Sequence, residues 1–284
     1  MMFVAIRDVL VRSLGFHNVF EGLKWLGVNS IELALDKKLK AVAFSSSLSD
    51  LDSLNEFISK LGENEVNVCA LLLANDFGSE DLESEIKYVK KGIEVAKRLG
   101  VKVVRVNAVM RPRLSWTLED MLSVTVNSLK SALCSDSVVW LAVENHGVVS
   151  NKREFLRGLF EMTKGLSIGL TLDTCNFYWY GYPLNEVYEI YEEFAKHVRH
   201  THIKNATSIG PKNSYRGRGS VKMQPLYEGD IDLKRAIRIL WENGYDHDLT
   251  IEDESLGRYS IRDRREIVLK DVQFLKETLR EVGG

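Results

Sequence analysis

The sequence predicts an α/β fold, a single (β/α)8 barrel. Three observations support this fold class: short apolar runs alternate with helical segments along the whole chain, eight such runs can be counted, and polar residues follow several of them. Alternating strands and helices are typical of a parallel sheet covered by helices, and about 250 residues make eight repeats. The 284 residues therefore fit one barrel domain over residues 1–284.

Eight short runs rich in apolar and β-branched residues are the predicted strands. Their apolar positions are continuous rather than alternating, as expected for parallel strands covered on both faces. These strands are Phe3–Ile6, Ser30–Leu35, Val66–Leu73, Lys102–Asn107, Val138–Glu144, Ile168–Asp173, Val198–Ile203 and Leu249–Asp253. The segment Ala41–Ser47 is compatible with a short extra strand or with a loop.

Amphipathic segments between the runs predict the outer helices, among them Glu80–Leu99, Thr117–Leu133, Leu184–Ala195 and a last helix over Ile261–Leu279. Glycines follow several helical segments, where C-caps are common, at Gly27, Gly62, Gly100 and Gly165. An open dinucleotide-binding sheet would carry Gly-x-Gly-x-x-Gly after the first strand, and Arg7-Asp8-Val9-Leu10 stands there instead.

Composition and charge narrow the class of protein. Apolar residues make up 45% of the chain and charged residues 27%, which is ordinary for a globular protein. The net charge of −2 gives no electrostatic reason to expect nucleic acid or a membrane as partner. Cys69, Cys134 and Cys175 are widely spaced and odd in number, so we expect free thiols and a cytoplasmic protein.

Four polar residues lie at or just after the ends of predicted strands: Glu144, Asp173, His202 and Glu252. Glu144 to Asp173 and Asp173 to His202 are both 29 residues, close to the length of one βα repeat. Residues at the carboxyl ends of barrel strands meet at the face that carries active sites. Three carboxylates and one imidazole suit a hard or borderline divalent cation, so the sequence predicts a metal site.

A long segment after the seventh strand is predicted to be a functional loop. Residues 205–230 have neither helical nor strand period, and four basic residues precede its first acid at Glu228. Structureless segments longer than about 12–15 residues are uncommon inside compact domains and are often functional. The basic residues are Lys212, Arg216, Arg218 and Lys222.

Local motifs resemble a known superfamily. They are Glu-Asn-His-Gly at 144–147, Asp-Thr-Cys-Asn-Phe at 173–177, His-x-His-Ile-Lys at 200–204 and Tyr-Glu-Gly-Asp-Ile-Asp at 227–232. Together they resemble the xylose isomerase-like TIM barrels and, more narrowly, the sugar phosphate isomerase/epimerase group. The resemblance implies one divalent ion, Mn, Mg or Co, on Glu144, Asp173, His202 and Glu252. It also implies isomerisation or epimerisation of a small sugar, sugar phosphate or polyol-derived ketone through an enediolate, with Glu144 and Glu252 as acid/base pair.

The resemblance also implies substrate contacts. Asn176 stands where some relatives have a histidine, and we interpret it as a hydroxyl contact. Arg216 and Arg218 fall where relatives carry an arginine that reaches substrate oxygens. Lys204 is a further candidate, although Asn205 follows it where many relatives have Asp.

The sequence alone adds further interpretations near the strand ends. His146 either contacts substrate or is a loop histidine bonded to the backbone. Further polar residues lie at or near the ends of the early strands, where they either line the pocket or form buried ion pairs: Arg7, Glu32, Asn75, Arg105 and Asn107. Arg7 and Glu32 are expected to form such a structural ion pair, and His197 and His200 are expected to be peripheral. Cys175 has no evident base beside it, so a thiol nucleophile is not predicted.

Several other functions compete with an isomerase. A dehydratase or lyase would use the same metal and the same intermediate. An abasic-site endonuclease would need a cluster of metal ions and more histidines than the 6 present. A glycosidase could use Glu144 and Glu252 but leaves Asp173 and His202 unexplained. A non-catalytic sugar-binding barrel is the last alternative, and a homo-oligomer is possible in every case.

Overall fold

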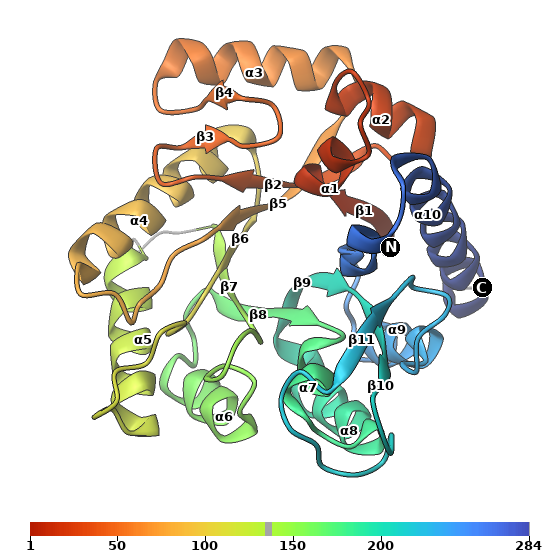
Figure 1. Cartoon of the computed structure of the whole chain (residues 1–284). Helices are drawn as coiled ribbons and strands as arrows, with labels where there is room; N and C mark the ends of the chain where they lie inside the picture. Colours follow the sequence, from red (N-terminus) through yellow and green to blue (C-terminus); the bar gives the residue numbers. More distant parts are fainter. Residues whose placement is uncertain (134–137, 284) are drawn as a thin grey trace. The chain divides into compact units, whose positions relative to one another are not determined.

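The computed structural model describes residues 1–133 and 138–283 (Figure 1). Within these residues, eight parallel strands form a closed barrel with surrounding helices, as the sequence predicts. The strand order is β1, β2, β5, β6, β7, β8, β9 and β12, and β12 pairs with β1. These strands are β1 Phe3–Arg7, β2 Ser30–Leu35, β5 Asn67–Leu73, β6 Val103–Val106, β7 Trp140–Glu144, β8 Ile168–Asp173, β9 Val198–Ile203 and β12 Asp248–Ile251.

The chain divides into two compact units that share strands β2 and β8. The first unit comprises Met1–Glu32 and Leu172–Gly284, and the second comprises Leu33–Thr171. The prediction of one domain over residues 1–284 stays a prediction, and each unit is described by itself.

Helices and short elements connect the barrel strands. In the first unit they are α1 Asp8–Ser13, α2 Val19–Leu26, α7 Asn176–Tyr180, α8 Leu184–Phe194, η1 Ala195–His197, α9 Leu233–Glu242, η2 Glu254–Arg258 and α10 Ile261–Gly283. In the second unit they are β3 Lys40–Ala41, β4 Ser46–Ser47, α3 Leu51–Glu63, α4 Leu82–Leu99, α5 Leu118–Ala132 and α6 Arg153–Met162.

Local sequence fixes several helix ends. Thr117 caps α5 with a reciprocal capping box, because its hydroxyl accepts from the Asp120 backbone N–H and the Asp120 carboxylate accepts from Thr117. Gly27 and Gly100 end α2 and α4 in the left-handed conformation, as predicted. Gly62 does not cap a helix, because α3 continues to Glu63.

Each unit has its own apolar packing. In the second unit, α5 contacts α4 and α6, and the small buried residues Ala70, Val103 and Ala142 of three neighbouring strands pack together with Cys69. In the first unit, α9 packs against α8 and α10 (Figure 1). All six residues of β2 and of β8 are buried, which explains their continuous apolar pattern.

The segment at 205–230 is not a structureless loop, so that prediction is wrong. It contains β10 (Asn205–Ser208) and β11 (Val221–Gln224), which pair antiparallel (Figure 1). The segment is held by polar contacts: the Asp230 carboxylate accepts from the Ser208 backbone N–H at 2.7 Å and from the Tyr178 hydroxyl at 2.9 Å. Such contacts leave no hydrophobic period for a sequence pattern to reveal.

The structure also describes the segment at 41–47, two of the three cysteines and the length of the helices. The segment at 41–47 contributes the short strands β3 and β4, with Ala41 paired antiparallel to Leu35. Cys69 and Cys175 are free cysteines, and Cys134 lies outside the described residues. Among the helices that the structure describes, none is both long and apolar enough to span a bilayer.

Gly181 offers a test of the turn after α7. It has φ +117°, and a Cβ there would overlap the carbonyl oxygen of Arg216. Gly244 has φ +84° with open space around it. We expect Gly244→Ala to cost about 1–2 kcal/mol from backbone strain alone and Gly181→Ala to cost clearly more. Urea denaturation of both variants checks this, and equal losses would contradict the packing at Gly181.

Candidate metal centre and active site

The strands of the first unit carry polar side chains on one face at their carboxyl ends. Residues two apart in a strand share a face, and His200, His202 and Lys204 are such a series at the end of β9. All three are buried. Strand β12 pairs with β9 so that Thr250 lies opposite His202, and Glu252 follows two residues later. The register therefore brings Glu252 to the level of Lys204.

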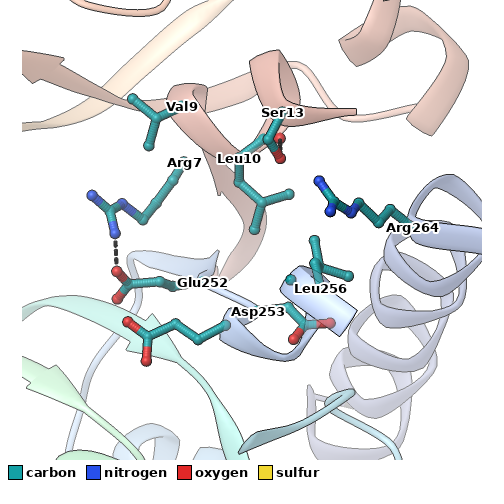
Figure 2. Close-up of a pocket in the computed structure, with 10 residues that line it drawn as sticks. Arg7, Val9, Leu10, Ser13, Glu252, Asp253, Leu256 and Arg264 are labelled. Carbon is teal, nitrogen blue, oxygen red and sulfur yellow. Dashed lines mark hydrogen bonds and ion pairs between the residues drawn. The ribbon is translucent and has the colours of Figure 1, made fainter. Parts of the chain in front are cut away.

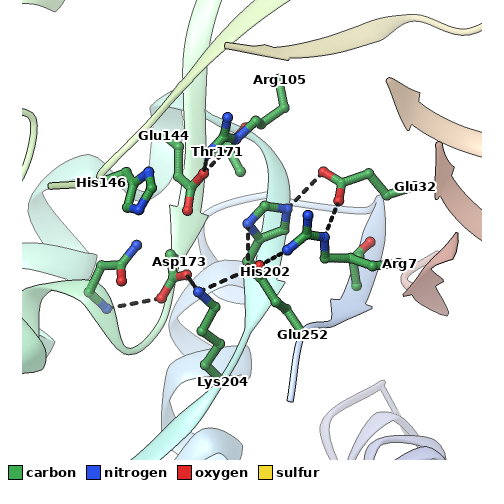
Figure 3. A network of polar contacts seen from close by, with 12 residues as sticks. Arg7, Glu32, Arg105, Glu144, His146, Thr171, Asp173, His202, Lys204 and Glu252 are labelled. Atoms are coloured by element: carbon green, nitrogen blue, oxygen red, sulfur yellow. Dashed lines mark hydrogen bonds and ion pairs between the residues drawn. The ribbon is translucent and has the colours of Figure 1, made fainter. Parts of the chain in front are cut away.

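Three of the four predicted metal ligands come together in the first unit. One oxygen of Asp173, one ring nitrogen of His202 and one oxygen of Glu252 lie within 4.8 Å of one another. The Lys204 ammonium lies 2.9 Å from Asp173 Oδ2 and 3.0 Å from Glu252 Oε2 (Figure 3). It also lies 3.1 Å from Glu254 Oε1. The Lys204 ammonium therefore lies among three carboxylates, and its predicted contact with a substrate stays a prediction.

The turn after β8 orients Asp173. Its Oδ1 accepts from the backbone N–H groups of Cys175, at 2.7 Å, and Asn176, at 2.9 Å. This leaves Oδ2 to face Lys204. Burial, and then the Asp173 charge, raise the pKa of the Cys175 thiol, so this cysteine is poorly suited to be a nucleophile.

His202 lies between two carboxylates. Its Nε2 is 2.7 Å from Glu32 Oε1, and its Nδ1 is 2.9 Å from Glu252 Oε2. Both ring nitrogens of His202 thus face carboxylate oxygens. With the carboxylates of Asp173 and Glu252, the imidazole makes a donor set of the kind that holds a borderline divalent cation, and one atom from each residue lies within 4.8 Å of the others.

Glu32 and His200 belong to the same buried network. His200 Nε2 lies 2.8 Å from Glu32 Oε1, and His200 Nδ1 lies 2.8 Å from Asp248 Oδ2. Burial alone would lower the pKa of His200, but Asp248 and Glu32 outweigh it and raise the pKa to about 10. Burial alone would raise the pKa of Glu32, but His202 and His200 bring it well below its usual value.

The expectation that His200 is peripheral is wrong, because its side chain is fully buried. The signal was present in the sequence: His-x-His in a strand places both imidazoles on one face. The expected ion pair of Arg7 and Glu32 is confirmed, with Arg7 Nε 3.1 Å from Glu32 Oε2. Arg7 also pairs with Glu252, so the same guanidinium joins the network to a predicted metal ligand (Figure 3).

A cavity of about 350 Å³ opens beside Glu252 in the first unit (Figure 2). Arg7 and Glu252 line it together with the apolar side chains of Leu10 and Leu256, and Arg264 lies on its wall. Glu252 is therefore both a predicted ligand and a residue that a small molecule in this cavity would meet.

Glu144 lies in the second unit, at the end of β7. Its carboxylate pairs with the Arg105 guanidinium through Nε and Nη2 (Figure 3). The third guanidinium nitrogen of Arg105 donates to the Leu73 carbonyl at 3.0 Å. Arg105 is 5% exposed and Glu144 is 2% exposed, so this ion pair is desolvated. Sequence patterns did not identify Arg105 as the partner of Glu144.

His146 and its neighbours form a second polar group in this unit. His146 Nδ1 lies 3.4 Å from Asn107 Oδ1. Asn107 is fixed by reciprocal bonds with Asn75, whose side-chain amide donates to the Asn107 carbonyl at 2.9 Å. The Ser150 hydroxyl donates to the carbonyls of Glu144, at 2.8 Å, and His146, at 2.9 Å. Both interpretations of His146, substrate contact and loop histidine, remain compatible with this position.

A charged cavity of about 630 Å³ also lies in the second unit. Its buried acids have partners of their own: Glu85 pairs with Lys37 and accepts from the Asp76 backbone N–H at 3.1 Å. Asp76 lies 3.4 Å from the Arg111 guanidinium. Arg111 and Lys37 are mostly exposed, so the cationic partner of each acid faces solvent.

Arg216 and Arg218 differ in their surroundings. The Arg216 guanidinium donates to Ser208 Oγ and the Tyr182 carbonyl, both at 2.9 Å, and stacks 4.1 Å over the Tyr178 ring. These contacts hold the β10–β11 hairpin on α7. Arg218 is exposed. The predicted substrate contacts of both arginines stay predictions, and the structure assigns Arg216 a structural role as well.

The fold and the site together define a (β/α)8 barrel with an acidic, histidine-containing centre at its strand ends. The family model described as xylose isomerase-like TIM barrel matches residues 20–278. The chain therefore belongs to the xylose isomerase-like TIM barrels.

Solved structures of other proteins have a similar fold. L-ribulose 3-epimerase is similar with a TM-score of 0.72 and 15% identity, over 99% of this chain and 96% of that chain. The IolI protein with a bound zinc atom has a TM-score of 0.70 and 19% identity, over 98% and 97%. Mannonate dehydratase from Streptococcus suis serotype 2 has a TM-score of 0.71 and 13% identity, over 100% and 96%. No curated protein matches the sequence significantly.

The ion pair of Arg105 and Glu144 can be tested by its contribution to stability. Arg105→Met leaves a buried carboxylate without its guanidinium, which costs about 3–5 kcal/mol of unfolding free energy. The double variant Arg105→Met/Glu144→Gln removes the charge as well and should recover part of the loss. Denaturation in the presence of a chelator measures both. A single variant as stable as the wild type would contradict a structural role for this pair.

Proposed function

We propose that the protein is a divalent-metal-dependent isomerase or epimerase of a small sugar, sugar phosphate or polyol-derived ketone. The observation that carries the proposal is the convergence of Asp173, His202 and Glu252 donor atoms within 4.8 Å at the carboxyl ends of barrel strands. This is the face at which (β/α)8 enzymes place their catalytic residues. The fold shared with an epimerase and with a zinc-containing protein supports the proposal.

Glu144 is the proposed fourth ligand. Its strand β7 pairs with β8 so that Glu144 lies opposite Thr171. Asp173 follows Thr171 by two residues and therefore shares its face. Manganese, magnesium and cobalt remain the preferred candidates for the single ion, and zinc is added by the similarity to IolI.

A divalent ion in this set would supply Lewis-acid polarisation of a carbonyl and a neighbouring hydroxyl. The protein's own groups then handle the proton. Glu252 lies at the cavity, and its orientation is fixed by Arg7 on Oε1 and by His202 and Lys204 on Oε2. A carboxylate fixed in this way can take a proton from a carbon next to a carbonyl. Lys204 would stabilise negative charge that develops beside it.

Glu144 is the proposed second member of the acid/base pair. Arg105 holds its carboxylate, and Ser150 holds its backbone carbonyl. A carboxylate on each side of a substrate carbon allows one to remove a proton and the other to return it, which inverts the carbon. His146 and Asn176 are proposed to contact substrate hydroxyls.

A dehydratase or lyase is the second candidate, favoured by the similarity to mannonate dehydratase. It would share the metal, the base and the first proton transfer, and would differ in losing water from the intermediate. The remaining expectations are unchanged: a cytoplasmic location, a small carbohydrate as partner and possible self-association.

Metal content tests the proposed ligand set. We expect about one ion per chain after dialysis against manganese, with loss in Glu144→Gln and Asp173→Asn, because each removes a charged ligand. Elemental analysis of the purified proteins measures this. Asp246→Asn is the matched control, since Asp246 is exposed at the surface and the same chemical change there should leave the ion in place. Full metal content in both site variants would contradict the proposed ligand set.

Proton exchange with solvent tests the proposed acid/base pair. We expect wild-type protein to incorporate solvent deuterium into a sugar or sugar phosphate substrate, and Glu144→Gln and Glu252→Gln to lose it by about 10²-fold or more. Glu189→Gln, at an exposed position of α8, should retain it. Mass spectrometry of recovered substrate and product measures the label. Loss of water from the product would instead identify the dehydratase.

A further inference from the structure

Asp253 and Asp271 are buried acids of the first unit that the proposed reaction does not use. Asp253 follows Glu252 after the end of β12, and Asp271 lies within α10. They are 6% and 0% exposed. Asp253 Oδ1 accepts from the Ser255 backbone N–H at 2.6 Å, and Asp271 Oδ1 accepts from the Leu226 backbone N–H at 2.8 Å. The backbone therefore holds one oxygen of each carboxyl group.

The second oxygens of these carboxyl groups and the Ser255 hydroxyl are buried and have no hydrogen-bond partner in the described part of the chain. The two carboxyl groups lie within hydrogen-bond reach of each other, and the Ser255 side chain lies beside Asp253. Buried polar atoms without a partner are rare in folded proteins, and a bound ion or water molecule is a recognised explanation. Three buried oxygen atoms from neighbouring side chains are thus left to bind something else.

The charge of this acid pair is also unbalanced. Among the described residues, no basic side chain forms an ion pair with Asp253 or Asp271. Arg258 acts on Asp253 from nearby, but its guanidinium donates to the Met223 carbonyl at 2.8 Å and to Gln224 Oε1 at 2.6 Å. Burial, and then the Asp253 charge, raise the pKa of Asp271 well above its usual value. The pair therefore needs a positive charge, which either a proton or a metal cation can supply.

A cation accounts for more of these observations than a proton does. A proton shared by the two acids would leave one negative charge buried and would not use the Ser255 hydroxyl. A divalent cation balances both carboxylates and can take the hydroxyl oxygen as a third donor. Donor atoms that are all oxygen suit the hard cations Ca²⁺ and Mg²⁺. Asp253 also lines the cavity beside Glu252, which gives an ion a route from solvent (Figure 2).

We propose that Asp253, Ser255 and Asp271 form a cation site for a hard divalent ion of the Ca²⁺ and Mg²⁺ class, apart from the centre at Asp173, His202 and Glu252. The ion joins the segment after β12, which carries Asp253 and Ser255, to α10, which carries Asp271. Unfolding separates these segments, so the ion binds the folded protein and stabilises it. This site does not depend on the proposed function.

Calorimetric titration with CaCl₂ and, separately, with MgCl₂ tests the site. The background is Asp173→Asn, which lacks a ligand of the strand-end centre. We expect about one ion per chain in this background and loss of that binding when Asp271→Asn is added, because one of two carboxylates is removed. Glu277→Gln is the matched control: Glu277 is exposed on the same helix, so the same chemical change there should leave binding intact. The salt that binds more tightly identifies the ion.

Thermal unfolding gives a second readout. Without added cation, Asp271→Asn should melt at the same temperature or higher, because the amide can donate to Asp253 without a proton or an ion. With saturating cation, the protein that retains Asp271 should gain in melting temperature and the Asp271→Asn protein should not. Ser255→Ala removes only a neutral donor and should weaken binding, which provides a second variant if Asp271→Asn does not fold.

Two results would overturn the proposal. No binding and no rise in melting temperature with either salt would mean that a shared proton compensates the acid pair. Binding that is unchanged by both Asp271→Asn and Ser255→Ala would place the ion elsewhere. Neither result bears on the strand-end centre, which is tested by the manganese content of protein with Asp173 intact.

Discussion

Charge compensation among buried side chains is the constraint on which the strand-end site depends. Removing a carboxylate from water costs several kcal/mol unless a partner repays it. In the first unit every acid of the network faces a cation or an imidazole: Asp173 faces Lys204, Glu252 faces Arg7 and Lys204, and Glu32 faces Arg7 with two histidines. The mutual contacts fix side-chain positions, so a metal ion would meet a preorganised donor set rather than having to assemble one.

The same constraint explains the charged residues that are not proposed ligands. Arg7 serves two acids at once, and Arg105 binds Glu144 through two nitrogens while its third donates to a backbone carbonyl. A planar guanidinium offers five donors in fixed directions, whereas an ammonium group offers three that rotate about a flexible stem. Arg216 repeats this on the hairpin, where its contacts are carbonyls, a hydroxyl and the Tyr178 ring. Each of these arginines donates to several acceptors at once and thereby fixes the positions of the groups that it contacts.

The fold and the convergence of Asp173, His202 and Glu252 were predictable because both depend on strand period. Continuous apolar runs located all eight barrel strands to within a few residues, and these three polar residues lie at strand ends, as predicted; metal binding by them stays a prediction. Among the partners, only the pair of Arg7 and Glu32 was predicted; the others join residues far apart in sequence, such as His200 and Glu32, which are 168 positions apart. The His-x-His spacing indicates that His200 and His202 share a face, but it does not identify the two acids between which His200 lies. The hairpin at 205–230 was missed because polar bonds, not apolar burial, hold it.

The pairing of each proposed acid/base residue with an arginine has a consequence for the reaction. Arg105 lies against the Glu144 carboxylate and Arg7 against the Glu252 carboxylate. Inversion of a carbon by two carboxyl groups needs one of them ionised and the other protonated at the start. The ionised group removes the proton from one face, the protonated group delivers its own proton to the other face, and the two groups end with their protonation states exchanged. A proton returned by the group that removed it would go back to the same face and leave the configuration unchanged, so the proposed epimerisation requires one of the two carboxyl groups to carry a proton beside its arginine.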